Sequence, residues 1–228
     1  MSSESYTPVV NPLPPVVAAL FLFIMGIEAI FSLGTRGLIG GPQAVGWRLN
    51  AIQDYAFSGD ILRWMLETGR YPAEDLLRFV SYPFVHGSFT QALFVGVFVL
   101  AMGKMVAEVF GAIAMLLVFV LSGIGGALAY GLLVNDSYPL IGGFPAVYGL
   151  IGAFTYMLWR SLSLVGANQA RAFTLIAFLM GVQLLFGLFF EIQKDWVADL
   201  AGFTTGFGLS FFVSPGGWMR LRRGVQRD

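Results

Sequence analysis

Only a few side chains in this sequence combine an apolar setting with the capacity for acid–base chemistry. Two carboxylates, Glu28 and Asp199, fall inside long apolar runs, and the single histidine, His86, stands just before another run. The chain has no cysteine, which excludes disulfides and thiolate metal clusters, and one histidine leaves little for a metal site. We therefore expect neither a metal nor a cofactor. A Glu28–Asp199 pair could act as an aspartyl-type dyad, because two neighbouring carboxyls in a low dielectric do not ionise together.

The composition places most of the chain in a lipid bilayer. The 228 residues are 57% apolar and 11% charged, whereas soluble domains carry about 25% charged residues. Basic and acidic residues balance at 13 each, so no overall positive field predicts nucleic-acid binding. Residues 1–15 lack the basic start and the small-residue cleavage site of a signal peptide, so we expect the first apolar run to stay as a membrane span.

Six apolar runs reach the roughly 20 residues needed to cross a hydrocarbon layer about 30 Å thick. The long connection between the first two runs, residues 37–85, contains patches of helical spacing together with Trp47 and Trp64, which indicate short helices at the membrane interface. The sequence therefore predicts an all-α polytopic membrane protein, one domain over residues 1–228, with six transmembrane helices and a long folded first loop. The expected spans lie near residues 16–35, 87–107, 111–134, 139–159, 172–190 and 196–214.

Basic residues predict the orientation of the chain. Four arginines occupy the tail 215–228, Arg160 and Arg171 bracket the fourth connection, and Lys104 is assigned to the second. By the positive-inside rule these segments are cytoplasmic, and an even number of spans then places both termini there. The compact six-span plan indicates a bacterial inner (cytoplasmic) membrane, with an organelle membrane as the alternative.

Three segments resemble, in order and spacing, the rhomboid family of intramembrane serine proteases. In segment 78–91 an arginine precedes a histidine by eight residues, as it does where the family enters its second span. Segment 142–149 is similar to the family's Gly-x-Ser-Gly-x-x-Tyr/Phe-Gly at the head of the fourth span, and segment 198–206 to Ala-His-x-x-Gly-x-x-x-Gly of the sixth. The positions that match the family pattern are Arg78, His86, Gly142, Tyr148, Gly202 and Gly206.

The departures from the family pattern fall on the residues that perform its chemistry. Phe144 stands at the position of the nucleophilic serine, Pro145 at the following glycine, and Asp199 at the general-base histidine. Gln91 and Val95 replace the second-span histidine and asparagine that help to hold the oxyanion. Peptide hydrolysis by this mechanism needs a hydroxyl beside a base and donors for the oxyanion. A phenylalanine has no hydroxyl and a proline has no N–H, so we expect no enzyme activity.

The resemblance implies a rhomboid-like pseudoprotease that binds or stabilises other transmembrane proteins, as a subunit or an assembly factor of a larger membrane complex. An active peptidase is the alternative, in which Ser81, Ser122 or Thr204 would supply the missing hydroxyl. A transporter or channel is a third interpretation, with little support, because ionisable residues within the spans are few and no inverted repeat is evident.

Individual residues carry further expectations. Asp199 is expected to hydrogen-bond to Tyr148 or to a backbone group, or else to contact a client or an ion. We expect His86 to bond within the first-loop fold beside Arg78, and Arg78 to tie that loop to the bundle through backbone carbonyls. The expected partner-binding features, besides the small-residue face of Gly202, Gly206 and Gly208, are Glu28, Phe203, Phe207 and Phe211.

Overall fold

A computed structural model of the chain describes residues 12–135, 137–189 and 194–215, the side chains of 186–189 excepted. Throughout these ranges the regular structure is helical, apart from one isolated antiparallel bridge between Phe57 and Leu140. The expectation of an all-α fold is therefore confirmed for the described part of the chain.

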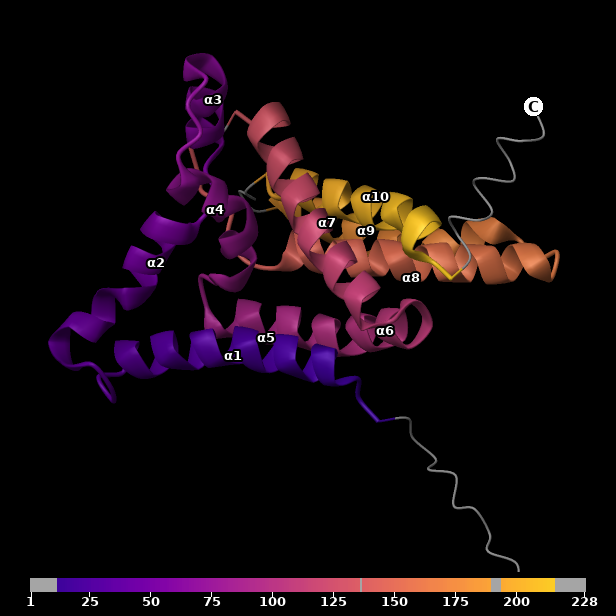
Figure 1. The fold of residues 1–228 in the computed structure, drawn as a ribbon, viewed down its shortest axis with the longest axis horizontal. Helices are drawn as coiled ribbons and strands as arrows, with labels where there is room; N and C mark the ends of the chain where they lie inside the picture. The colour runs from indigo at the N-terminus through magenta and orange to yellow at the C-terminus, as the bar shows by residue number, and fades with distance from the viewer. Residues whose placement is uncertain (1–11, 136, 190–193, 216–228) are drawn as a thin grey trace, which may run out of the picture.

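The long helices follow the apolar runs of the sequence closely. Figure 1 shows α1 and α5 side by side, with α7 running obliquely from α6 across α8 and α10. A π-helical segment, Val99–Gly103, joins α5 to α6, so that Phe89–Phe110 forms one continuous helical stretch. The bounds are Pro15–Thr35 (α1), Phe89–Phe98 (α5), Lys104–Phe110 (α6), Ala112–Leu133 (α7), Phe144–Leu164 (α8), Thr174–Phe189 (α9) and Trp196–Val213 (α10).

Four helical stretches of the described residues are long and apolar enough to cross a membrane. They are Pro15–Thr35, Phe89–Phe110, Ala112–Leu133 and Trp196–Val213. The predicted count of six is not confirmed by this criterion. The fourth predicted span, 139–159, also began too early, because α8 starts only at Phe144. Gly142 takes a positive φ of 87°, which no helical residue adopts, and Pro145 then occupies the first turn, where a missing N–H costs nothing.

Glycines allow α7, α8 and α10 to approach each other backbone to backbone. A Cβ on Gly126 of α7 would come within 2.7 Å of Pro145 and 2.8 Å of the Ala198 carbonyl oxygen. Added Cβ atoms on Gly202 and Gly206 would overlap the backbone of α8 at Pro145 and Gly149. Close packing of this kind stabilises membrane helices, since lipid supplies no hydrophobic drive between them.

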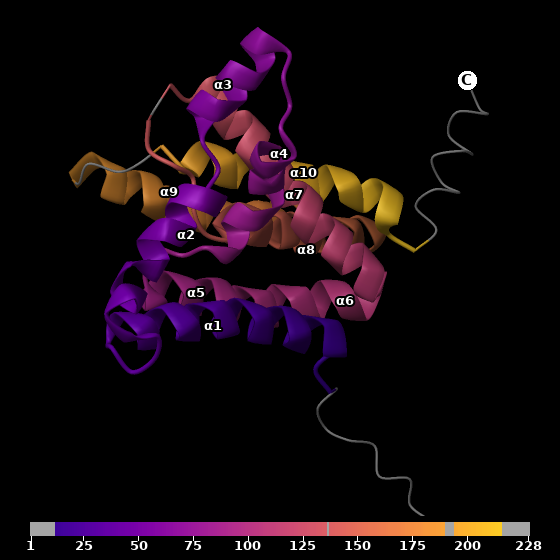
Figure 2. The ribbon, with the colours of Figure 1, turned by 60° about the vertical axis from the view of Figure 1, so that its left-hand side comes forward.

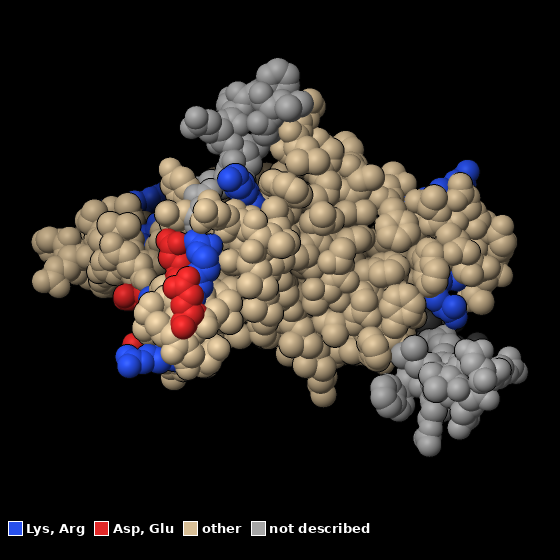
Figure 3. Space-filling model, turned by 90° about the horizontal axis from the view of Figure 1, so that it is seen from above, with Lys and Arg blue, Asp and Glu red and all other residues tan. Residues whose placement is uncertain are grey.

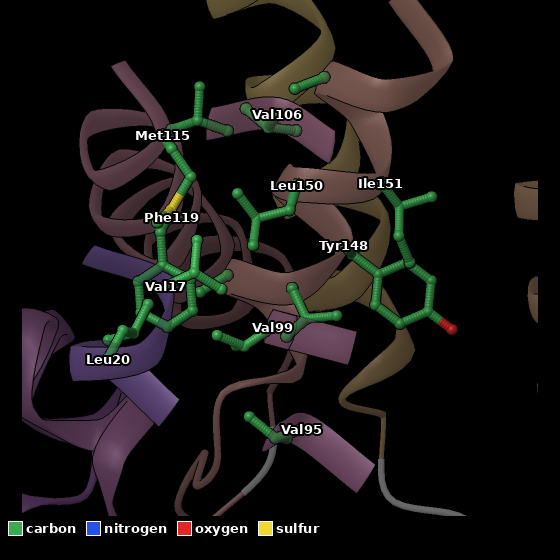
Figure 4. Packing of buried hydrophobic residues seen from close by; sticks show 14 of the residues in the cluster. Val17, Leu20, Val95, Val99, Val106, Met115, Phe119, Tyr148, Leu150 and Ile151 are labelled. Atoms are coloured by element: carbon green, nitrogen blue, oxygen red, sulfur yellow. The ribbon is translucent and has the colours of Figure 1, made fainter. Parts of the chain in front are cut away.

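The largest apolar cluster is built around α8. Figure 4 shows Leu150 and Ile151 of this helix packed among side chains from the other helices, including Val17 of α1 and Val99 of the π-helical segment. Leu150, Ile151, Val17 and Val99 are fully buried. The ring of Tyr148 joins the same cluster, while its hydroxyl points away from it (Figure 4). The core therefore fixes α8 and with it the segment that resembles the protease motif.

The first loop is folded into short helices, as its helical spacing predicted. It contains η1 (Gly41–Gly46), α2 (Trp47–Tyr55), α3 (Gly59–Thr68), α4 (Ala73–Ser81) and η2 (Tyr82–Phe84). Figure 2 shows these helices stacked above one end of α1 and α5.

Arginines hold this loop together and fasten it to the bundle. The Arg63 guanidinium donates to the carbonyls of Gly131 and Val134 at the end of α7, at 3.5 and 3.4 Å. Arg78 donates to the carbonyls of Gln53 and Ala56, at 2.8 and 3.0 Å. It thus joins α4 to α2 within the loop, and the expectation that it ties the loop to the bundle was wrong.

Charged side chains gather toward the two ends of the molecule. Figure 3 shows them at both ends of the long axis, with a broad uncharged middle between them. Lys104 was predicted to lie in the connection between the second and third spans, and this was wrong. It lies inside the Phe89–Phe110 stretch, where its Nζ is 3.8 Å from a carboxylate oxygen of Glu108. The arginines of the tail lie in residues 216–228, outside the described part of the chain.

Candidate functional site

The three segments that resemble protease motifs meet around one cavity of about 330 Å³. Phe144 and Tyr148 of α8, Gln91 of α5, and Asp199 of α10 line it. The remaining lining comes from α9 and from the start of α10: Phe178, Leu179, Val182, Gln183 and Asp195. The structure therefore brings together the positions that sequence comparison assigned to the nucleophile, the general base and one oxyanion donor.

Phe144 reaches this cavity because the chain turns sharply just before α8. A side chain on Gly142 would come within 2.6 Å of the Gln91 amide nitrogen and 3.4 Å of the His86 ring. Glycine at this position thus satisfies both the left-handed backbone and the close approach. The turn directs Phe144 into the cavity at the point where α8 begins.

His86 is buried, with 1% of its surface exposed, and supports this turn from behind. Its Nε2 accepts a hydrogen bond from the backbone N–H of Gly143 at 3.4 Å, and its carbonyl accepts one from Arg48 at 2.6 Å. Burial lowers the pKa of His86 to about 4, so the ring is neutral at physiological pH. His86 does bond to the first loop, as expected, but through its backbone carbonyl, and the arginine beside it is Arg48 and not Arg78.

The two positions that hold oxyanion donors in the protease pattern have other tasks here. Gln91 accepts from the Gly87 N–H at 2.8 Å and donates to the Ile141 carbonyl at 3.4 Å. Its amide thereby links the segment just before α5 to the turn that precedes α8. Val95 is fully buried in the main apolar cluster and offers no polar group.

Asp199 is 3% exposed and is linked to Tyr148 only through a third residue. Its Oδ2 accepts from the Gln183 amide at 3.0 Å, and Gln183 Oε1 accepts from the Tyr148 hydroxyl at 3.4 Å. The other oxygen, Oδ1, has no hydrogen-bond partner among the described residues. The sequence reading missed Gln183, although an amide within the apolar run of α9 was a signal of a polar contact.

Asp195 is a second cavity residue that the sequence reading missed. It precedes Asp199 by four residues, so both carboxyls face the same side of the first turn of α10. Burial raises the pKa of Asp195 above its ordinary value. A charged Asp195 is therefore costly unless a cation or further donors approach it.

Glu28 does not pair with Asp199. Arg48 of α2 donates to both of its carboxylate oxygens, at 2.9 and 2.6 Å, and Ser32 donates at 2.7 Å. The aspartyl-type dyad was therefore wrong, and so was Glu28 as a partner-binding residue, because its side chain is fully buried in this ion pair. The pair fastens the first loop to α1.

The phenylalanine and glycine faces of α10 are occupied within the molecule. Phe203 is 6% exposed, and Phe207 and Phe211 contact the rings of Tyr156 and Trp159 at centroid distances of 4.7–6.1 Å. Gly202 and Gly206 face α8. Both faces were predicted to bind a partner; Phe203, Gly202 and Gly206 pack within the molecule instead. A Cβ on Gly208 would meet nothing within 4 Å, so for this residue partner binding stays a prediction.

The hydroxyls considered as replacement nucleophiles lie with other groups. Ser81 donates to the Tyr55 carbonyl at 2.9 Å, and the exposed Thr204 donates to the Ala201 carbonyl at 3.0 Å. Ser122 is fully buried against α8 and has no hydrogen-bond partner in the described ranges. Over those same ranges, no group of three or more histidine and acidic side chains could hold a metal ion.

Comparison with known proteins agrees with this arrangement. The chain is 29% identical over 153 residues to RHOMBOID-like protein 2 of Arabidopsis thaliana, covering 66% of this chain and 47% of that protein. It is 27% identical over 150 residues to RHOMBOID-like protein 4 of the same plant, covering 64% and 37%. The chain thus spans less than half the length of these relatives. The Rhomboid domain family matches residues 73–216, which include all three motif segments and every helix from α4 to α10. On the strength of that match, this integral membrane protein belongs to the rhomboid family.

Proposed function

We propose that this protein is a rhomboid pseudoprotease that binds or stabilises other transmembrane proteins, as a subunit or assembly factor of a membrane complex. One observation carries the proposal: the cavity at the protease position is lined by Phe144 and Asp199 in place of a serine and a histidine. A cavity with neither nucleophile nor imidazole can hold a segment without cutting it.

The chemistry around Phe144 supports the same conclusion. Pro145 presents no N–H at the start of α8, and the Gln91 amide is engaged with the Ile141 carbonyl. An oxyanion forming here would lack two of the donors on which acyl-transfer catalysis depends. Restoring the nucleophile alone would leave these donors missing.

A surface for a client lies beside the cavity on α9. Phe178, Leu184 and Leu185 are 65%, 50% and 54% exposed, and Phe178 also lines the cavity. In a membrane these side chains meet lipid or another helix. We propose this face of α9 as the client-binding surface, in place of the α10 faces that are packed internally.

We also propose a topology and a location for the protein. All six long helical stretches, with α8 and α9 among them, cross the bilayer, and both termini are cytoplasmic. The cavity then opens near the opposite surface, where α5, α8 and α10 begin. The plant origin of the matched relatives makes a eukaryotic organelle membrane a stated alternative to the bacterial inner membrane.

Site-specific photo-crosslinking in native membranes tests the client-binding role. A photoreactive phenylalanine analogue at Phe178 should capture a discrete membrane protein, and the same analogue at Ile113, which is 77% exposed on α7, should capture only lipid. The same preparation should not cleave a generic transmembrane substrate. Cleavage that Asp199→Ala abolishes would contradict the proposal and would point to a peptidase with a different nucleophile.

A further inference from the structure

We propose that the cavity binds an organic cation. If the protein binds clients as proposed above, this cation is a lysine or arginine side chain near the end of a client's transmembrane segment. The inference deepens the proposed function and rests on it for the source of the cation. Asp199 is an unsatisfied acid: it is 97% buried, lines the cavity, and has an oxygen, Oδ1, without a partner in the described part of the chain. A buried carboxylate oxygen that makes no hydrogen bond is costly, so a bound donor would stabilise it.

The charges around the cavity favour a cationic donor over a neutral one. Asp195 and Asp199 both line it, and none of the described residues that line it is a lysine or an arginine. Lys194, the nearest basic residue in sequence, is exposed. Among the ion pairs of the described residues, none joins Lys194 to either carboxylate. Two acids at one apolar cavity therefore have no counter-charge among the described residues, and a bound cation would supply one.

The apolar lining also fits a cation. Phe144, Tyr148 and Phe178 bring three aromatic rings to the cavity that holds the carboxyls. Aromatic faces attract ammonium and guanidinium groups, and combined aromatic and acidic linings are typical of sites for organic cations. The volume of about 330 Å³ is at the small end of the ~300–1,000 Å³ range of ligand pockets. It suits one long side chain and not a whole helix.

The depth of the cavity suits a basic side chain at the end of a transmembrane helix. Asp199 is the fourth residue of α10, which places it about 5 Å along the helix axis from its first residue. Lysine and arginine side chains near helix ends extend toward the interface while their stems stay in the apolar layer. A client helix on the α9 face could therefore insert such a side chain between Phe178 and the two carboxyls.

Binding of synthetic transmembrane peptides to the full chain in nanodiscs tests the source of the cation. One peptide carries a single lysine near one end, and the other has norleucine there. We expect the lysine peptide to bind about tenfold more tightly, as a charge-assisted hydrogen bond with a cation–π contact allows. Asp199→Asn, which keeps an oxygen for Gln183, should abolish the preference, and Asp195→Asn should reduce it. The matched control Glu67→Gln, at an exposed position on α3, should leave it intact.

Two further arms separate the possible failures. The stability of the full chain in micelles is measured with n-butylguanidinium and with n-butylurea, its neutral counterpart. Stabilisation by n-butylguanidinium but not by n-butylurea, lost in Asp199→Asn, supports the cation site. If neither peptide binds in that case, the result contradicts only the proposed client binding. Equal binding of both peptides together with equal effects of both small molecules would overturn the cation site. Nanodiscs with and without phosphatidylethanolamine form the lipid arm: Asp199-dependent retention of that lipid, with no peptide preference, would overturn the client side chain as the source.

Discussion

His86 gives the folded protein a pH dependence of stability that an exposed histidine would not. Its pKa falls from 6.5 to about 4 on burial, so between these values the unfolded chain binds a proton that the folded chain does not. Stability is therefore full above pH 6.5 and is lost as the pH falls toward 4. At about 1.4 kcal/mol per pH unit, the loss reaches on the order of 3 kcal/mol.

His86→Gln tests this assignment, because glutamine can still accept from the Gly143 N–H but does not titrate. Thermal unfolding in detergent, followed from pH 7 to pH 4, should show a steeper loss for the native protein than for the variant. Carboxyl groups titrate in both proteins, so the difference between the two curves isolates the histidine. Parallel curves would contradict a neutral, buried His86.

Phe144→Ser is expected to leave the protein without measurable cleavage of a transmembrane substrate. The variant restores a hydroxyl, but Asp199 is hydrogen-bonded to Gln183 and Pro145 still lacks an N–H. A nucleophile without a positioned base and oxyanion donors gains little rate. The native protein is the control in a cleavage assay by gel and mass spectrometry. Cleavage by the single variant would mean that Asp199 serves as the base.

Some residues of the cavity could be identified from local sequence motifs, and others could not. Phe144 and Asp199 were identified because their motifs are contiguous and carry their own spacing. Gln183 was not, because its contact with Asp199 depends on how α9 is rotated against α10. Arg48 binds Glu28 across 20 residues of sequence, and composition alone could not choose among the arginines of the first loop. Contacts between residues on different helices can be identified only once the fold is known.

At the scale of elements, the contact of α10 with α8 depends on Gly206. An added Cβ there would overlap the Gly149 carbonyl, backbone against backbone, so neither side can yield by a rotamer change. Gly206→Ala should cost about 1–3 kcal/mol, the usual range for overpacking. Gly208→Ala is the matched control on the same helix, because its Cβ would meet nothing within 4 Å. Unfolding in mixed micelles should separate the two variants; equal stability would contradict the observed α8–α10 contact.

The ion pair between Arg48 and Glu28 joins α2 to α1. Arg48→Met would leave a buried carboxylate without its cation, and we expect a loss of about 3–5 kcal/mol. In the double variant Arg48→Met with Glu28→Gln the charge is gone, so much of the stability should return. A double-mutant cycle by thermal unfolding measures this coupling. Additive losses would show that the pair does not couple the two helices.

The membrane environment explains why the sequence did not predict which face of α10 packs internally. The apolar faces of α10 were expected to bind a partner, yet Phe203, Phe207 and Phe211 pack on α8 and its neighbours. In a soluble protein, an apolar face predicts the buried side. In a bilayer both lipid and protein are apolar, so hydropathy locates a helix without telling which face meets protein. The short helices of the first loop were predicted correctly, because polar residues there restore the contrast.

At the scale of the whole molecule, the number of spans depends on α8 and α9. Helix α8 has 21 residues, enough for about 30 Å at 1.5 Å per residue, but it carries polar groups that lower its hydropathy. Eleven of its residues are buried by protein, and a helix surrounded by other helices needs less apolar surface than one surrounded by lipid. Such an environment would allow α8 to cross the membrane despite its modest hydropathy.

Single cysteines can decide between four spans and six, because the native chain contains none. Tyr71→Cys in the first loop and Val165→Cys after α8 replace side chains that are 54% and 75% exposed. If α8 and α9 both cross, a membrane-impermeant maleimide should label these two positions from opposite sides of sealed vesicles. Ser137→Cys, between α7 and α8, should share the side of Tyr71→Cys under either count and so controls for vesicle orientation. Labelling of positions 71 and 165 from one side would leave four spans, with α8 and α9 entering and leaving by the same surface.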